Sequence, residues 1–286
     1  MDIRHLLIST LSLILTLNNC MVFADNKKSP ATVEALVIFK CGTVNSPDRS
    51  LWSPGVDVNV KHQMVASCYL IRHKDGMMVW DTGIPEFVKS KPEGVTLAQG
   101  KIKLTLEQPF PEALKSFGIK PEEIDFLALS HMHADHAGNA NAFATATWLV
   151  QEAEYDAAFG PLAKQLNFNP KTYEKLSHSK VIKLNGHHDV FNDGSVILIP
   201  APGHTPGHQV LFVRLPSGPV VLSGDLWHFQ SNWKFSRVPG FNYDPKQTAD
   251  SMKAINALLI ATGAKLYIQH DFVQNSQLPH APDIIR

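Results

Sequence analysis

Short apolar runs alternate with polar, turn-forming segments along most of this chain. Runs rich in Val, Ile, Leu and aromatic residues and bounded by Gly, Pro or Asp are typical of β-strands. They predict strands at residues 35–39, 64–71, 77–80, 124–129, 148–150, 181–184, 196–199, 210–213, 220–222 and 266–268. The run at 124–129 is almost wholly apolar, as expected of a strand that is covered on both faces.

Helices are predicted between these strands at residues 114–118, 137–146 and 251–259. The segments 86–120 and 228–245 are rich in Pro, Gly and aromatic residues, and for most of their length we expect loops over a site. Because runs of strands have helices between them and no break in composition divides the chain, the pattern predicts a single layered α/β domain over residues 25–286.

Composition excludes some classes of protein. The 286 residues carry 26 Lys and Arg against 26 Asp and Glu, and 44% of them are hydrophobic. Disordered chains combine low hydrophobicity with high net charge, so this chain is expected to fold. Nucleic acid is not an expected partner, because no excess of basic residues is present to neutralise phosphates.

The first 24 residues are predicted to be a secretory signal peptide. Arg4 and His5 precede an apolar run at residues 6–17, and Val22-Phe23-Ala24 fits a small-residue cleavage site. The run is too short for a membrane span, which needs about 20 apolar residues. A buried N-terminal helix and a lipoprotein anchored at Cys20 are the alternatives. We therefore expect an exported protein, periplasmic or secreted.

Cleavage after Ala24 would leave two cysteines, Cys41 and Cys68. An oxidising compartment permits a disulfide between them if their two predicted strands pair. Two buried free thiols that pack as small hydrophobic groups are the equally weighted alternative.

The strongest chemical signal is the segment Ser130-His-Met-His-Ala-Asp-His-Ala-Gly138, which follows the buried strand at 124–129. His131 and His133 lie two residues apart, on one side of an extended segment. Asp135 is expected at a helix N-cap, with His136 in the first turn. Imidazole and carboxylate groups suit zinc and similar ions, so the four residues predict a metal site.

Three later turns each present a further potential ligand after a predicted strand. They are Pro202-Gly-His-Thr-Pro-Gly-His208, Ser223-Gly-Asp225 and Gln269-His-Asp271. Chemistry in α/β folds gathers at the carboxyl ends of strands, so we expect these ligands to join the first four.

This set of motifs resembles the metallo-β-lactamase superfamily, and most closely its N-acyl-homoserine lactone lactonases, the quorum-quenching branch. The resemblance covers most of residues 33–275 and includes Val79-Trp-Asp-Thr-Gly83 and Gln151-Glu-Ala-Glu154. It implies a four-layer αββα sandwich and a hydrolase with a small-molecule acyl lactone as substrate.

The resemblance also implies two metal ions, zinc or other divalent metals, and a division of the ligands between them. One ion would take His131, His133 and His204. The other would take Asp135, His136 and His270. Asp225 would bridge the two, together with a hydroxide that attacks the lactone carbonyl. Asp135 could also carry the proton to the leaving alkoxide.

Other classes stay open at this point. Hydroxyacylglutathione hydrolases, which are thioesterases, resemble the chain in all seven ligands, and β-lactamases of the same superfamily also retain the His-rich motif. A non-catalytic zinc-binding module is a third reading, although such a module would tolerate the loss of a ligand and all seven positions are filled.

Several further residues have a functional and a structural interpretation. Asp81 either orients a metal ligand or caps a turn, and His208 is expected to support its loop rather than to bind metal. The aromatic residues after Asp225 either line an acyl-chain pocket or pack in the core; they are Trp227, Phe229, Trp233, Phe235 and Phe241.

His228 marks a departure from the family pattern, in which a tyrosine commonly stands three residues after the bridging aspartate. We predict that the His228 imidazole takes over the donor role at the lactone, as a catalytic residue beside Asp135. A loop histidine turned to solvent is the alternative.

Overall fold

A computed structural model describes residues 32–286, so the predicted signal peptide at residues 1–24 lies outside the described residues. Most of the described chain is built around two β-sheets. The larger sheet has eight strands in the order β4-β5-β1-β2-β3-β6-β7-β8. Their bounds are β1 Val33–Ser46, β2 His62–His73, β3 Gly76–Trp80, β4 Val95–Leu97, β5 Ile102–Thr105, β6 Phe126–Ala128, β7 Thr147–Gln151 and β8 Val181–Leu184.

The smaller sheet has five strands in the order β13-β12-β11-β10-β9. Their bounds are β9 His188–Asp189, β10 Val196–Pro200, β11 Gln209–Leu215, β12 Gly218–Leu222 and β13 Lys265–Tyr267. The helices are α2 Phe110–Ser116, α3 Ala134–Ala137, α4 Glu152–Phe159, α5 Gln230–Phe235, α6 Pro245–Thr262 and α7 Phe272–Ser276.

Both faces of the central strands are buried, and successive side chains enter different cores. In β1, Leu36 and Ile38 pack between the two sheets. Val37 and Phe39 point the opposite way, into the core behind the larger sheet. The period of two along a strand produces this division, and it explains why the strand runs are apolar rather than alternating.

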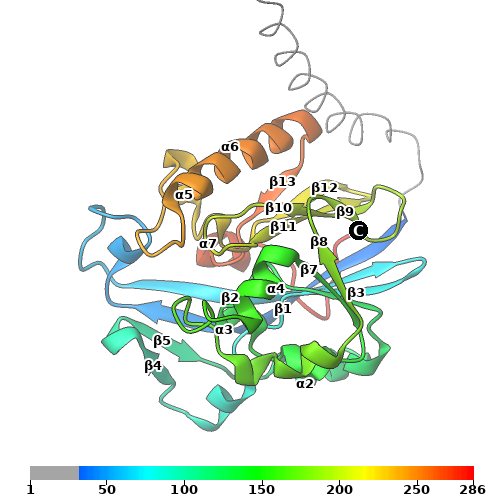
Figure 1. The fold of residues 1–286 in the computed structure, drawn as a ribbon, viewed down its shortest axis with the longest axis horizontal. Coiled ribbons are helices and arrows are strands. Elements are labelled where there is room, and N and C mark those ends of the chain that lie inside the picture. The colour runs from blue at the N-terminus through cyan, green and yellow to red at the C-terminus, as the bar shows by residue number, and fades with distance from the viewer. Residues whose placement is uncertain (1–31) are drawn as a thin grey trace, which may run out of the picture.

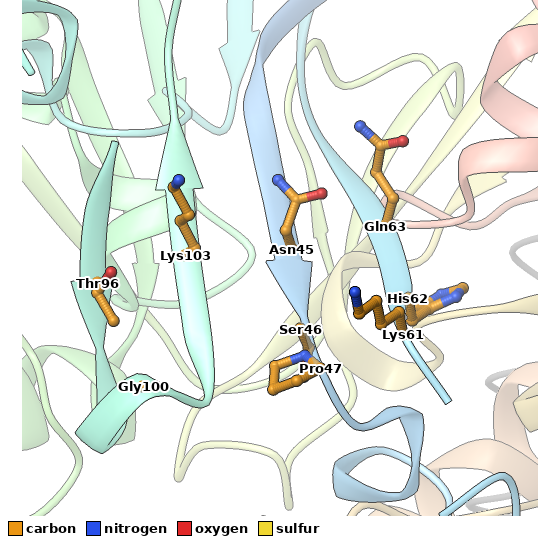
Figure 2. A pocket seen from close by; sticks show the side chains of 9 residues that line it. All are labelled: Asn45, Ser46, Pro47, Lys61, His62, Gln63, Thr96, Gly100 and Lys103. Carbon is orange, nitrogen blue, oxygen red and sulfur yellow. The ribbon is translucent and has the colours of Figure 1, made fainter. Parts of the chain in front are cut away.

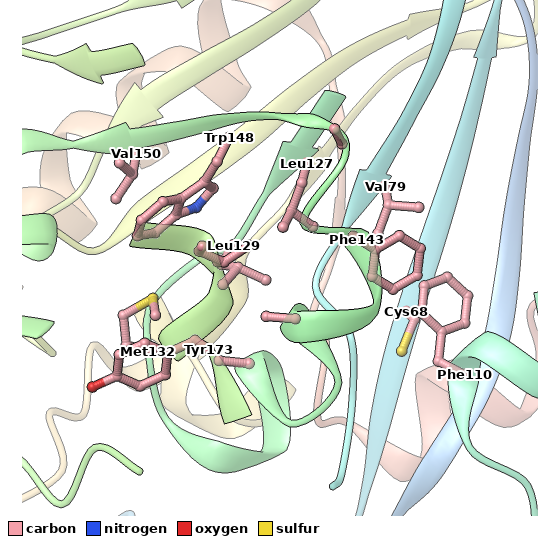
Figure 3. Close-up of a cluster of buried hydrophobic side chains, with 14 of the residues drawn as sticks. Cys68, Val79, Phe110, Leu127, Leu129, Met132, Phe143, Trp148, Val150 and Tyr173 are labelled. Carbon is pink, nitrogen blue, oxygen red and sulfur yellow. The ribbon is translucent and has the colours of Figure 1, made fainter. Parts of the chain in front are cut away.

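Three hydrophobic cores therefore separate four layers. α6 covers the smaller sheet through residues such as Met252 and Ile255. On the far side of the larger sheet, Phe110 of α2 and Trp148 of β7 lie in one cluster with Leu127 and Tyr173 (Figure 3). Figure 1 shows the succession from α6 through the two sheets to α2. The four-layer αββα sandwich expected from the family resemblance is confirmed.

The predicted helix at 137–146 is wrong. α3 ends at Ala137, and a separate 3-10 turn covers Ala140–Phe143. The chain leaves the helix because Gly138 lies against another backbone, where a Cβ atom would sit 2.2 Å from the carbonyl oxygen of Gly83. Asn139 then donates hydrogen bonds to the carbonyls of Thr82 and Ile84. These tertiary contacts outweigh the helical propensity of the alanine-rich segment.

The prediction of loops at 86–120 and 228–245 is only partly right. The first segment contributes β4 and β5, which extend the larger sheet beyond β1, and it also contributes α2. The second contains the short helix α5. α4 was not predicted at all. These elements are short and carry little hydrophobic periodicity, so contacts with neighbouring elements, rather than their own sequence, determine their secondary structure. Within residues 32–286, no helix combines the length and the apolar character that crossing a membrane requires.

Candidate metal centre

The chain places its predicted ligands just after strands of both sheets. His131 and His133 follow β6, and the turns that carry His204, Asp225 and His270 follow β10, β12 and β13. All these strand ends lie on the same side of the sandwich, so ligands that are far apart in sequence meet between the two sheets. This arrangement is the one expected for open α/β sheets.

Asp135 and His136 reach the same place from within α3. The N-cap of this helix is His133, whose carbonyl accepts from the backbone N–H groups of His136 and Ala137. The prediction that Asp135 occupies the N-cap is therefore wrong by two residues. Because the helix begins earlier, Asp135 and His136 are both held by helical backbone.

The first donor group consists of His131, His133, His204 and Asp225. Three imidazole nitrogens form a small triangle: His131 Nε2 lies 2.8 Å from His133 Nδ1, which lies 3.0 Å from His204 Nε2. The third side, between the Nε2 atoms of His204 and His131, is 3.2 Å. Ligands around one tetrahedral zinc ion lie about 3.3 Å from each other, given zinc–nitrogen bonds of about 2.0–2.1 Å. The triangle is thus close to the geometry that a single ion requires.

The second donor group consists of Asp135, His136 and His270. The Nε2 atoms of the two histidines are 3.1 Å apart, and Asp135 Oδ2 lies 3.6 Å from His270 Nε2.

Asp225 connects the two groups through its two carboxylate oxygens. Its Oδ1 lies 3.1 Å from His136 Nε2 and 3.0 Å from His270 Nε2. Its Oδ2 lies 3.2 Å from His204 Nε2 and 3.7 Å from His131 Nε2. One carboxylate therefore presents one oxygen to each group, which is the position of a bridging ligand between two cations.

Each of the five histidines in the two groups has a hydrogen-bonding partner behind its ring. When such a partner accepts the far N–H, the near nitrogen carries a lone pair directed at the centre. The contacts are His131 Nδ1 with Ser130 Oγ at 3.0 Å, His133 Nε2 with the Leu166 carbonyl at 3.0 Å, His136 Nδ1 with Asp81 Oδ2 at 2.9 Å, His204 Nδ1 with Asn242 Oδ1 at 3.0 Å and His270 Nδ1 with the Val65 carbonyl at 2.6 Å. Five lone pairs and two carboxylates thus converge, and this donor set fits divalent cations.

The surroundings shift the pKa values of the histidines in two directions. Burial lowers the pKa of His131 and brings that of His133 to about 3, which keeps both rings neutral at pH 7. Burial opposes the charged form of His136 as well, but Asp225 and Asp81 outweigh it and raise the pKa of this ring. Because a ligating imidazole must be neutral, metal binding would displace protons from the second group.

Asp81 orients His136, one of the predicted metal ligands, and is more than a turn cap. It is fully buried, and its Oδ1 accepts from the Ser130 backbone N–H at 2.6 Å. Its Oδ2 accepts from Ser130 Oγ and Gln269 Nε2 and contacts His136 Nδ1. The sequence left the role of Asp81 open between a turn cap and the orientation of a ligand, and the structure places its carboxylate against the His136 ring.

His208 supports its loop, as predicted, and lies outside both donor groups. Its Nδ1 lies 3.0 Å from the Ala201 carbonyl, and its Nε2 accepts from the backbone N–H of Asp225 at 2.9 Å. The ring thereby fixes the turn that carries the bridging carboxylate.

The sequence analysis gave no role to two supporting residues. Asn242, in the segment expected to be a loop, holds His204. Glu154 is buried and accepts from the backbone N–H groups of Met132 and Gly207, which ties the His-rich segment to the turn after β10. Burial raises the pKa of Glu154. The Gln151-Glu-Ala-Glu154 motif, which the resemblance included without a role, was the signal available for it.

His228 is buried beside the centre, so the solvent-exposed alternative is excluded. Its side chain is 2% exposed, and its Nε2 lies 3.1 Å from Asp225 Oδ2. Burial lowers its pKa to about 4, so the ring is neutral at pH 7. Its ring centroid lies 6.1 Å from that of Trp52 and 6.0 Å from that of Phe241.

The aromatic residues after Asp225 were expected either to pack in the core or to line an acyl-chain pocket, and they do not all behave alike. Trp227 and Phe229 pack in hydrophobic cores. Trp233 and Phe235 are partly exposed, and Trp233 contacts Asn256 of α6. Phe241 is 51% exposed and lies 6.0 Å from the ring of His204. It is the member of the set that contacts both His204 and His228.

Two hollows elsewhere on the surface do not include the predicted ligands. One of about 480 Å³ lies over β4, β5, β1 and β2, where Lys103, Asn45 and Gln63 project from neighbouring strands (Figure 2). The other, of about 880 Å³, lies between β1, α2 and the C-terminal segment. The chemistry of the donor groups, rather than the size of a cavity, therefore identifies the functional site.

The family of this chain follows from a match to the model of the metallo-β-lactamase superfamily over residues 63–270. The chain belongs to the metallo-β-lactamase superfamily. All seven predicted ligands lie within that match, and with this donor set the superfamily member is a metal-dependent hydrolase.

Curated relatives of this superfamily member include N-acyl homoserine lactonases. That of Bacillus thuringiensis is 30% identical over 255 residues, which span 86% of this chain and 95% of the relative. The lactonase AttM of Rhizobium johnstonii is 30% identical over 227 residues, spanning 75% of this chain and 85% of the relative.

Solved structures agree with these relatives. A structure of B. thuringiensis AiiA with N-decanoyl-L-homoserine bound at its active site has a TM-score of 0.79 and 27% identity, covering 89% of this chain and 100% of that chain. An N-acyl homoserine lactone hydrolase with N-hexanoyl-L-homoserine bound at its catalytic metal centre has a TM-score of 0.78, 26% identity and the same coverage.

Proposed function

We propose that this protein hydrolyses N-acyl-homoserine lactones to N-acyl-homoserines with the help of two divalent ions. The observation that carries the proposal is the position of Asp225, which presents one carboxylate oxygen to each of two complete donor groups. The relatives named above, which are N-acyl homoserine lactonases, support the choice of substrate.

His131, His133 and His204 would hold one ion, and Asp135, His136 and His270 the other, with Asp225 shared. Zinc suits this set of imidazoles and carboxylates. Two such ions supply an acidified water as nucleophile and polarise the lactone carbonyl.

The residues of the chain itself bind and orient the lactone. The neutral His228 ring carries one N–H group and lies beside Asp225. With both oxygens of that carboxylate on the ions, this N–H would be free to donate to a lactone oxygen as negative charge develops. Asp135, whose side chain is 23% exposed, is open to the substrate side and passes a proton to the leaving alkoxide. The ring of Phe241, which is 51% exposed beside His228, provides apolar surface for the acyl chain.

The test is a hydrolysis panel of acyl-homoserine lactones, simple lactones, a thioester and nitrocefin, with and without a chelator. We expect acyl-homoserine lactones to give the highest kcat/KM, with one proton released per ring opened and with loss of activity on chelation. A higher kcat/KM for nitrocefin or for the thioester than for every lactone would move the assignment to another branch of the superfamily.

The dinuclear centre has its own measurement. Metal analysis of the folded protein should find two ions per chain, and Asp225→Ala should lose the bridge, at least one ion and most of the activity. One ion or fewer in the fully folded wild type under zinc-replete conditions would contradict the dinuclear centre.

A further inference from the structure

A disulfide joins β1 and β2, two neighbouring strands of the larger sheet, close to the candidate metal centre. Cys41 lies in β1 and Cys68 in β2, with their Cα atoms 5.9 Å apart. Cys68 pairs in register with Phe39, so Cys41 lies two residues further along β1. The register of the two strands shifts next to it, between Lys40 and Thr43. Both cysteines are buried, and Figure 3 shows Cys68 in the cluster that contains Val79 and Phe110. Of the two alternatives drawn from the sequence, the structure shows the disulfide.

The turn after β3 rests directly on this disulfide. Gly83 has a φ angle of +69°, and a Cβ atom there would lie 2.3 Å from Cys41 Cβ and 2.9 Å from Cys68 Sγ. The backbone N–H of Ile84 donates to the Cys41 carbonyl at 3.1 Å. No space therefore separates the cysteine pair from the backbone of the turn.

The same turn holds the metal ligand His136 from two sides. Asp81 Oδ2 lies 2.9 Å from His136 Nδ1, and Thr82 Oγ1 donates to the His136 carbonyl at 2.9 Å. In addition, the Gly138 backbone N–H donates to the Gly83 carbonyl at 3.0 Å. The ring and the backbone of His136 are thus fixed by Asp81 and Thr82, which directly precede the Gly83 that lies against the disulfide.

We infer that the Cys41–Cys68 disulfide positions the second donor group, and that the ion held by Asp135, His136 and His270 binds with full affinity only while the pair is oxidised. This inference deepens the proposed function and rests on its metal centre. It assigns the disulfide a task at the active site beyond joining two strands.

The physical link is the space that sulfur occupies. A dithiol reagent would supply two electrons and two protons, break the S–S bond, leave two thiols and itself become a disulfide. Non-bonded atoms keep roughly van der Waals separation, whereas bonded sulfurs lie much closer. The two thiols therefore need more room, and the Gly83 backbone lies against them. Its displacement would reach Asp81 and Thr82, and through them His136.

The first donor group should respond less to the state of the disulfide. Two of its rings are held from other parts of the chain, His133 by the Leu166 carbonyl and His204 by Asn242. Reduction is therefore expected to weaken one ion selectively rather than to empty the centre.

Three forms of the full mature chain separate this mechanism from simple cross-linking: the oxidised wild type, the reduced wild type and Cys41→Ala/Cys68→Ala. The wild type is reduced with a dithiol in mild denaturant, and the dithiol and the denaturant are then removed. The free thiols are alkylated and counted by mass spectrometry. Zinc per chain, titrated against a competing chelator, and the absorption spectrum of bound Co²⁺ report the two sites. Near-UV circular dichroism checks that each form is folded.

We expect the oxidised protein to bind two ions. The reduced wild type should bind the ion of the second donor group about 10–100-fold more weakly, which is the loss found when the partner of a metal ligand is removed. The double-alanine variant lacks the bond but also the bulk of the thiols, so it should bind the second ion more tightly than the reduced wild type. Both cross-link-free forms should melt at a lower temperature than the oxidised protein.

Equal affinity for both ions in oxidised and reduced wild type would overturn the inference. So would equal loss in the reduced and double-alanine forms, because cross-linking alone would then explain the effect. If the reduced protein does not refold, the oxidised Gly83→Ala variant tests the same contact, because the added Cβ atom would displace the turn from the disulfide. Retention of two tightly bound ions in that variant would also overturn the inference. Metal titration needs no substrate, so these results are independent of whether an acyl lactone is hydrolysed.

Discussion

At the scale of single residues, the centre is organised by what lies behind each ligand. The five histidines of the two donor groups differ in which nitrogen faces the centre, since His133 uses Nδ1 and the other four use Nε2. In each case the partner at the opposite nitrogen sets the choice. Residues outside the two donor groups, such as Asn242 and Asp81, therefore help to arrange the centre.

The role of His228 can be tested by substitution. His228→Ala should lower kcat by roughly 10–1000-fold, the span of acid–base and oxyanion contributions, because it removes the neutral donor beside the lactone. Two ions per chain should remain, and His228→Tyr should retain part of the rate. The exposed His178→Ala is the matched control. Unchanged kcat and KM in His228→Ala would remove this residue from the catalytic set.

Asn242 provides a test of the partners behind the ligands. Asn242→Ala should weaken binding of the ion held by His204 by about 10–100-fold, because the ring loses the acceptor that fixes its orientation. Metal titration measures the effect. Asn256→Ala makes the same change where the amide contacts Trp233 away from the centre, and it should leave both ions in place. Identical metal affinity in the two variants would show that Asn242 has no part in holding His204.

At the scale of elements, the strand ends determine where ligands lie, and tight turns determine how close they come. Gly224, in the turn after β12, has a φ angle of +49°, and a Cβ atom there would lie 2.6 Å from Ser130 Cβ and 2.7 Å from His208 Nε2. The two sheets thus approach each other at this glycine, next to the bridging carboxylate. Close packing at this point brings the ligands of both sheets within reach of each other.

Gly224→Ala is expected to destabilise the fold by about 1–3 kcal/mol through this overlap, in addition to its backbone strain. Gly263→Ala is the matched control, because Gly263 has a φ angle of +66° with no atom near the added Cβ. Denaturant unfolding of the metal-free proteins compares the two, and the difference between them isolates the contact. Equal destabilisation would mean that strain alone explains the glycine.

At the scale of the whole molecule, hydrophobic cores hold the two sheets and their helices together, and the candidate metal centre lies between the sheets, beyond the ends of their strands. Because the large apolar interior does not depend on the ions, we expect the fold to persist when a chelator removes them. The disulfide adds a cross-link between β1 and β2 that an oxidising compartment would maintain.

We propose that the chain is exported and that the mature protein begins at Asp25. The basic start, the apolar run and the cleavage site before Asp25 support this. Mass spectrometry of the periplasmic fraction should find that N-terminus. A lipid-modified Cys20 would favour a lipoprotein, and a full-length chain confined to the cytosol would refute export.

The sequence by itself determined the family, the positions of most strands along the chain and the seven candidate ligands, because strand signals and ligand motifs are local. A short apolar run followed by His, Asp and Gly shows where a strand ends and what it carries. The short elements β4, β5 and α4 escaped detection because partner strands and buried contacts stabilise them more than their own sequence does.

Only the tertiary structure decided which side chains act together. The partners of the ligands lie far away in sequence: 38 residues separate Asn242 from His204, 55 separate Asp81 from His136, and 205 separate Val65 from His270. No local pattern encodes such distances. The burial of His228, the sharing of Asp225 between two groups and the contact of the disulfide with Gly83 arise where the two sheets and their turns pack, so they follow from the fold as a whole.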